Sequence, residues 1–169
     1  MLCKAVKTAT SKLLKAKLAA PGSFQGCAEE ETQSLERRFL LRLPPCYQDF
    51  LAVMGRAAGD FLVGTDYSFP GILEFRQSAE ELLRASQSGF ELPPSAFVFL
   101  FDQGYTFLFF DCQDGPEGPP VFMFTEAEKS PRQVSDSFSV WLLAAVEDDI
   151  AAFRELWASP EKRDEQGTA

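Results

Sequence analysis

The 169-residue sequence contains no histidine and no asparagine. Without histidine, catalysis by Ser-His-Asp or Cys-His groups, histidine metal sites and the zinc deaminase site are excluded in their usual forms. Without asparagine, no N-glycosylation sequon exists. The sequence also lacks the glycine patterns of phosphate-binding and dinucleotide-binding loops. These absences remove much of the hydrolase and nucleotide-binding repertoire.

Cysteine is scarce, and membrane and export signals are lacking. The four cysteines, Cys3, Cys27, Cys46 and Cys112, are far apart and form no Cys-x-x-Cys pair. No apolar run approaches the roughly 20 residues that cross a bilayer. Lysines interrupt the apolar residues at the N-terminus, so no secretory signal is expected. The sequence therefore predicts a cytoplasmic protein with reduced thiols, no disulfide framework and no membrane association.

Charge is distributed unevenly. Residues 1–28 contain five lysines and no acid, whereas the remaining 141 residues carry 11 of the 16 basic and all 25 acidic residues, a net charge of −14. Such a field repels nucleic acid and attracts a cationic partner. Solubility alone is the simpler explanation of the same charge, and it requires no partner.

Length and composition fit one well-buried domain. Three phenylalanine-rich segments, 97–101, 105–110 and 121–124, have short glycine-containing links and predict an antiparallel meander. Shorter strands are expected at 60–63 and 72–75. The three core strands do not alternate apolar with polar residues, so both faces of the sheet should be covered. Helices and loops of the same chain are the expected cover, which favours a monomer or a weak homodimer; a docked partner is the alternative.

Helical periodicity appears in five places. Helices are expected over 6–20, over 28–41, from Pro44 onward, from a capping box at Ser78, and from 135 to 157. The organisation predicted is a basic N-terminal helix and loop (1–27) packed on a domain (28–158), followed by a disordered tail (159–169). The lysines of the first helix form a solvated face or, alternatively, a patch for an anionic surface. The fold class predicted is α+β.

One block carries a family resemblance. Leu43-Pro44-Pro45-Cys46-Tyr47 begins a helix, the apolar pair Phe50-Leu51 anchors it, and Gly55 and Gly59 lead into the following turns. This block resembles the opening of the SUKH superfamily, which includes fungal Smi/Knr-type cell-wall regulators and bacterial toxin-immunity proteins. Segments 97–110 and 136–138 are similar to later family elements in the same order. Met54-Gly55-Arg56 departs from the Asn-Gly of many members, which leaves the subfamily open.

The resemblance implies an α+β fold and action by binding. It implies no catalytic residue, metal or cofactor, and none is expected here. Bacterial members are implied to neutralise a toxin, often a nuclease or deaminase; fungal members imply a regulatory scaffold. An acidic domain of this kind would bind a basic toxin domain. The expected contact residues are exposed acids and aromatic tips on loops and helix ends: Asp60, Asp66, Tyr67, Gln103, Tyr105, Asp114, Glu117, Asp148 and Asp149. Each of them, taken singly, is equally well explained as a solvated turn.

Carboxylate catalysis is the remaining enzymatic alternative. Asp111 and Asp114 flank one loop, and residues 147–149 are three consecutive acids on a helix. A two-carboxylate hydrolase or a divalent-metal site uses such groups. The loop lacks the alternating ligands of a calcium site, and adjacent acids on a helix point in different directions. The sequence therefore favours a binding protein over an enzyme.

Overall fold

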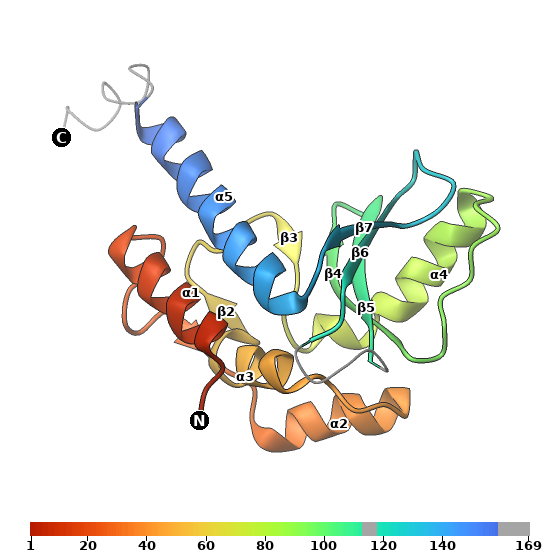
Figure 1. The fold of residues 1–169 in the computed structure, drawn as a ribbon, viewed down its shortest axis with the longest axis horizontal. Helices are drawn as coiled ribbons and strands as arrows, with labels where there is room; N and C mark the ends of the chain where they lie inside the picture. The colour runs from red at the N-terminus through yellow and green to blue at the C-terminus, as the bar shows by residue number, and fades with distance from the viewer. Residues whose placement is uncertain (113–117, 159–169) are drawn as a thin grey trace.

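The fold is a five-stranded antiparallel sheet with helices packed on both faces (Figure 1). The structure, a computed structural model, describes residues 1–112 and 118–158. Its helices are α1 (Lys4–Lys15), α2 (Glu29–Phe39), α3 (Pro45–Met54), α4 (Phe75–Ala85) and α5 (Phe138–Ala158), with a 3-10 turn at Gly71–Leu73. Its strands are β1 (Phe24–Gln25), β2 (Ala57–Ala58), β3 (Thr65–Asp66), β4 (Ala96–Asp102), β5 (Thr106–Asp111), β6 (Val121–Thr125) and β7 (Arg132–Ser135). The single α+β domain expected from the sequence is confirmed.

The main sheet has the strand order β3-β4-β5-β6-β7, and every neighbouring pair is antiparallel. The meander of three phenylalanine-rich strands is confirmed as β4, β5 and β6. The edge strands β3 and β7 were not predicted, because they are short and contain few apolar residues. A separate two-stranded ribbon joins β1 to β2, with Phe24 opposite Ala58.

Both faces of the central strands are covered by the chain itself. The ring of Phe99 contacts Trp141 of α5, whereas the ring of Phe101 contacts Phe75 of α4. A register shift between Val98 and Leu100 explains how residues two apart reach opposite faces. Helices α3 and α5 therefore cover one face, and α4 with its following loop covers the other (Figure 1). The continuous apolar runs follow from this double cover.

Helix α3 supplies the centre of the core, as the opening block predicted. Pro45 occupies its first turn, where a missing amide hydrogen costs nothing. Tyr47 is fully buried, with its ring centroid 5.2 Å from that of Phe110 and 5.0 Å from that of Phe138. Among the described residues, nothing accepts or donates a hydrogen bond at its hydroxyl. Helix α3 thereby joins the sheet to the start of α5.

The predictions between residues 60 and 75 were wrong. Residues 61–64 form turns instead of the predicted strand at 60–63. Residues 71–73 form a 3-10 turn where the strand at 72–75 was predicted. Helix α4 begins at Phe75, before Ser78, so Ser78 lies inside the helix instead of capping it. The reason is tertiary: Ile72, Phe75, Ala79 and Leu83 recur at helical spacing and are all buried.

Helix α1 ends earlier than its sequence indicated. Its last residue is Lys15, and Lys17 adopts a left-handed conformation with φ of 63°. The amide of Leu18 then donates to the carbonyl of Leu13 over 3.1 Å, which closes a Schellman-type C-terminus. This reversal buries Leu18, and the gain from its burial explains why a non-glycine residue tolerates the left-handed turn.

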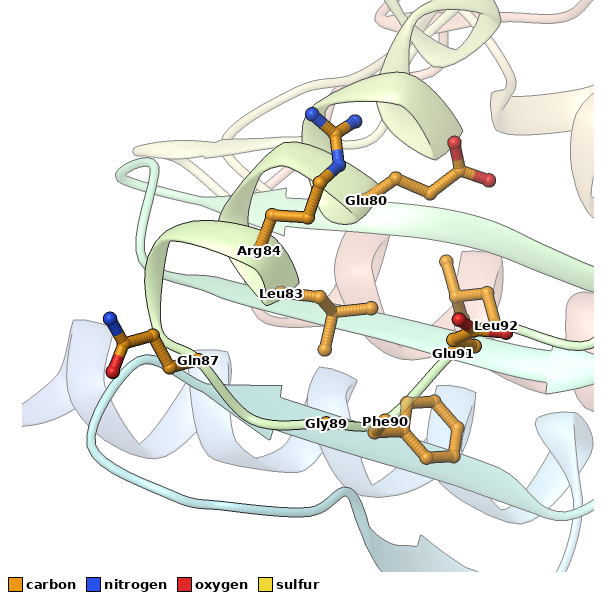
Figure 2. A pocket seen from close by; sticks show the side chains of 8 residues that line it. All are labelled: Glu80, Leu83, Arg84, Gln87, Gly89, Phe90, Glu91 and Leu92. Atoms are coloured by element: carbon orange, nitrogen blue, oxygen red, sulfur yellow. The ribbon is translucent and has the colours of Figure 1, made fainter.

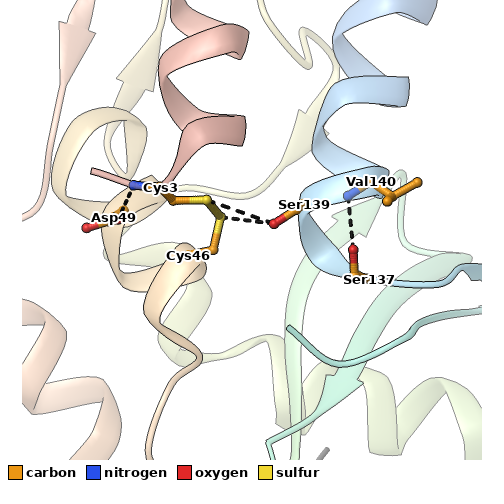
Figure 3. Close-up of a disulfide and its surroundings, with 6 residues drawn as sticks. All are labelled: Cys3, Cys46, Asp49, Ser137, Ser139 and Val140. Carbon is orange, nitrogen blue, oxygen red and sulfur yellow. Dashed lines mark hydrogen bonds between the residues drawn. A yellow bond between two sulfur atoms is a disulfide. The ribbon is translucent and has the colours of Figure 1, made fainter. Parts of the chain in front are cut away.

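The expectation of four reduced thiols was also wrong. Cys3 and Cys46 form a disulfide that links residues 43 apart in the sequence (Figure 3). Helix α1 packs against α3 and α5, and this packing brings the two cysteines together. Asp49 accepts a hydrogen bond from the Cys3 amide over 2.6 Å, and Ser139 donates to the Cys46 sulfur. Cys27 and Cys112 are free thiols, and burial raises their pKa values to about 11 and about 12.

Candidate functional site

The segment 59–66 is fixed to the fold at several points. Gly59 adopts a φ of +65°, and a Cβ there would lie 2.4 Å from the carbonyl oxygen of Leu18. The amide of Leu62 donates to the Asp149 carboxylate over 2.7 Å. Thr65 then pairs with Asp102 at the edge of the sheet. Because both ends are held, the exposed residues between them lie on a well-ordered loop.

This segment presents Asp60, Val63 and Asp66 to solvent. Val63 is 74% exposed, which is unusual for a β-branched apolar residue on an anchored loop. Lys17 borders Asp60, since both line a shallow hollow beside the end of α1. The Asp60 side of the segment therefore has mixed charge, whereas the Asp66 side adjoins the turn between β4 and β5.

That turn contains two of the predicted residues. Gln103 and Gly104 both have positive φ, 48° and 84°, as a tight hairpin of the I′ kind requires. The Tyr105 hydroxyl donates to the Gln103 side-chain oxygen over 3.2 Å, and Tyr105 is 44% exposed. The amide of Glu126 donates to the Tyr105 carbonyl and brings another exposed acid to the turn. An exposed aromatic tip thus lies on this turn, and the backbone of one exposed acid is hydrogen-bonded to it.

Helix α5 contributes two more of the predicted contact acids, Asp148 and Asp149. Asp148 is exposed, whereas Asp149 is half-buried. Burial raises the pKa of Asp149, the hydrogen bond from the Leu62 amide opposes that rise, and the charge of Asp148 adds to it. Asp149 therefore anchors the 59–66 segment, and Asp148 is the carboxylate available to a partner.

One predicted residue is buried, and two others lie outside the described residues. Tyr67 is only 8% exposed, and its ring lies against Phe50 and Phe61, so it belongs to the core. Burial raises its pKa. Asp114 and Glu117 lie outside the described residues. We define the acidic end as the exposed residues Asp60, Val63, Asp66, Gln103, Tyr105 and Asp148.

Helix α4 is flanked by two hollows. One, of about 440 Å³, lies between α4 and the β4–β5 turn and is lined by Asp66, Phe75, Glu81, Leu82, Phe101 and Gly104, among others. The second, of about 410 Å³, lies at the end of α4. Figure 2 shows its apolar floor of Leu83, Phe90 and Leu92 and its charged rim of Glu80, Arg84 and Glu91. The sequence analysis missed Glu81 as a surface contact because it assigned the Glu81 side chain to a capping box with Ser78.

Two of the carboxylates considered for catalysis make structural contacts. Glu147 pairs with Lys12 of α1, and Asp149 is occupied by the Leu62 amide. Asp111 is described, but its proposed companion Asp114 is not. In residues 1–112 and 118–158, no three histidine, cysteine or acidic side chains are grouped so that they could hold a metal ion.

Fold and surface together define a small α+β domain that offers loops for binding. The sequence pattern of the SMI1 / KNR4 family (SUKH-1) matches residues 26–144, and the chain belongs to this family. Domains of this family are in general non-catalytic and bind protein partners. No curated protein matches the sequence. Within the described ranges, no helix has both the length and the apolar composition needed to cross a membrane.

Proposed function

We propose that this chain is an immunity-type protein that binds and neutralises a basic toxin domain, of the nuclease or deaminase kind, through its acidic end. The observation that carries the proposal is that Asp60, Asp66, Asp148 and the aromatic tip Tyr105 are all exposed, on elements that hydrogen bonds and strand pairing anchor. Carboxylates next to an exposed aromatic ring suit contacts to lysine and arginine. Family membership supports action by binding, and the net charge of the chain, −9, favours rapid encounter with a cation.

The proposed partner surface is pre-formed. Hydrogen bonds from Leu62 to Asp149 and from Tyr105 to Gln103 hold its loops before any partner arrives. A pre-formed surface loses little conformational entropy on binding. Since the central strands are covered on both faces by the chain, we expect the protein to bind as a monomer. The predicted cytoplasmic location stays a prediction, and the Cys3–Cys46 disulfide is unusual for a reducing compartment.

The test is affinity capture of the tagged protein from lysate at about 50 mM and about 500 mM salt, which changes the Debye length roughly threefold. The expected result is a basic toxin-like chain whose recovery falls at the higher salt. The double variant Asp60→Asn/Asp148→Asn should lose that partner. The matched control, Glu29→Gln/Glu30→Gln on α2, removes the same charge from another face and should retain it.

A regulatory scaffold is the second candidate function. The exposed Val63 and the apolar floor of the hollow in Figure 2 favour it, because apolar contacts survive high salt. A partner that is neutral or acidic, is captured equally at both salt concentrations and is insensitive to Asp60→Asn/Asp148→Asn would support the scaffold. That outcome would contradict the immunity proposal.

A further inference from the structure

The hollow between α4 and the β4–β5 turn has an aromatic floor. Phe75 from α4 and Phe101 from β4 both line it, with ring centroids 6.1 Å apart and ring planes inclined by 50°. Leu82 extends the floor along the helix. The hollow has a volume of about 440 Å³ and is open to solvent, so a side chain of a partner can reach its floor.

The rim of this hollow carries two carboxylates without a cation. Asp66 projects from the edge strand β3, and Glu81 projects from α4; both are exposed. The ion pairs within the described residues include neither of them. Glu81 accepts only a neutral amide hydrogen bond from Gln77. Its neighbour Glu80, by contrast, pairs with Arg76. Among the residues that the structure describes, none that lines the hollow is basic.

These two features restrict the occupant. An anion would be repelled by Asp66 and Glu81, and a purely apolar group would desolvate both carboxylates without compensation. A long cationic side chain satisfies both parts, since its apolar stem lies on the floor while its charged end meets the rim. Arginine fits better than lysine, because its planar guanidinium can donate to two carboxylates at once.

We propose that this hollow is a receptor for one arginine side chain of a protein partner. The inference deepens the proposed function and rests on it, because it identifies the group by which a basic partner is recognised. The guanidinium lies between Asp66 and Glu81, and the stem lies over Phe75 and Phe101. Gly104 leaves the entrance open, since even a Cβ built on it would meet no atom within 4 Å.

The test is an amide-detected NMR titration of the full chain with N-acetyl-L-arginine amide. Because a single side-chain contact gives a Kd on the order of 1 mM or weaker, the titration runs to about 20 mM. Saturable shifts are expected at the amides of Ser78, Glu81 and Gly104. N-acetyl-L-citrulline amide keeps the shape but lacks the charge, and its shifts at equal concentration should be at least about fivefold smaller. N-acetyl-L-lysine amide should bind more weakly than the arginine probe.

The variant Asp66→Asn/Glu81→Gln should raise the Kd of the arginine probe at least about tenfold, whereas the control Glu29→Gln/Glu30→Gln should not change it. Both pairs are on the surface, and urea unfolding midpoints within error of the parent chain verify that the variants fold. Shifts of equal size with citrulline, an equal or better lysine response, shifts away from the hollow, or retained affinity in the variant would each overturn the proposal. The titration uses no toxin, so its result is separate from that of the capture experiment.

Discussion

The Cys3–Cys46 disulfide gives a prediction whose size follows from its position in the sequence. It links residues 43 apart and so closes a long loop in the unfolded chain. The loop-closure relation for a loop of about this length gives a stabilisation of about 4 kcal/mol at 25 °C. The double substitution Cys3→Ser/Cys46→Ser removes the cross-link without leaving an unpaired thiol. We expect it to lower the free energy of unfolding by about 3 to 4 kcal/mol, because measured values often fall below the entropic relation.

The assay is urea unfolding followed by circular dichroism, with and without a thiol reductant. For a urea slope of about 2 kcal/mol per molar, the expected loss moves the unfolding midpoint down by roughly 1.5 to 2 M. Reductant should shift the parent chain by a similar amount and leave Cys3→Ser/Cys46→Ser unchanged. The matched control Cys27→Ser/Cys112→Ser alters the two free thiols and should keep the full response to reductant.

Two results would refute this reasoning. The first is alkylation of all four cysteines in the denatured, unreduced chain, because the structure leaves only Cys27 and Cys112 free. The second is a parent chain whose unfolding midpoint does not respond to reductant. A response that disappeared in Cys27→Ser/Cys112→Ser instead of Cys3→Ser/Cys46→Ser would place the cross-link elsewhere.

Three further predictions concern the core and the anchor of the acidic end. Gly26→Ala should lower the free energy of unfolding by about 3 kcal/mol or more, because the added Cβ would lie 1.8 Å from the carbonyl oxygen of Ala52. The control Gly22→Ala has open space around it and should change the free energy of unfolding, measured with urea, by less than about 0.5 kcal/mol. Tyr47→Phe should leave the free energy of unfolding unchanged or raise it by up to about 1 kcal/mol, because the buried hydroxyl has no hydrogen-bond partner among the described residues. A loss above about 1 kcal/mol in the same assay would show that the hydroxyl has a hydrogen-bond partner. The pKa of Asp149 is raised in the folded state, so folding favours the protonated carboxyl. The stability that this group contributes is therefore fully present below its unfolded pKa of about 3.9 and is lost as the pH rises through its folded pKa. Asp149→Asn should therefore be more stable than the parent at pH 7 and lose that advantage in acid, as urea unfolding across pH would measure; an advantage independent of pH would contradict the assignment.

The central sheet could be predicted because local and tertiary signals agree there. The phenylalanine-rich segments have strand propensity, short turns link the first two, and the unbroken apolar runs required cover on both faces. The edge strands could not be predicted. Thr65–Asp66 and Arg132–Ser135 have weak local preference, and only pairing with their neighbours makes them strands.

The exposure of the candidate residues was predicted in part, because acids in turns carry a local signal for exposure, whereas the burial of Tyr67 depends on tertiary packing; their role as a partner site stays a prediction. Asp60, Asp66, Gln103, Tyr105 and Asp148 are exposed as expected. The misplacement of the strand before Tyr67 explains the error there. Once Asp66 is an outward residue of β3, the alternation of strand side chains turns the next residue inward. The hollow beside α4 had no sequence signal, because it forms only where a helix meets a turn about 25 residues away in the chain.

The segments outside the family match contribute to the arrangement of the acidic end. The match spans 26–144, so α1 and the second half of α5 lie beyond it. These two segments pack together, joined by the Lys12–Glu147 ion pair, and the Cys3–Cys46 disulfide attaches α1 to the family's opening helix α3. Asp149, in the second half of α5, holds the 59–66 segment through the Leu62 amide. A loop inside the family region is therefore positioned by a helix segment outside it. We expect changes in that helix to alter the proposed binding surface while the five-stranded sheet stays the same.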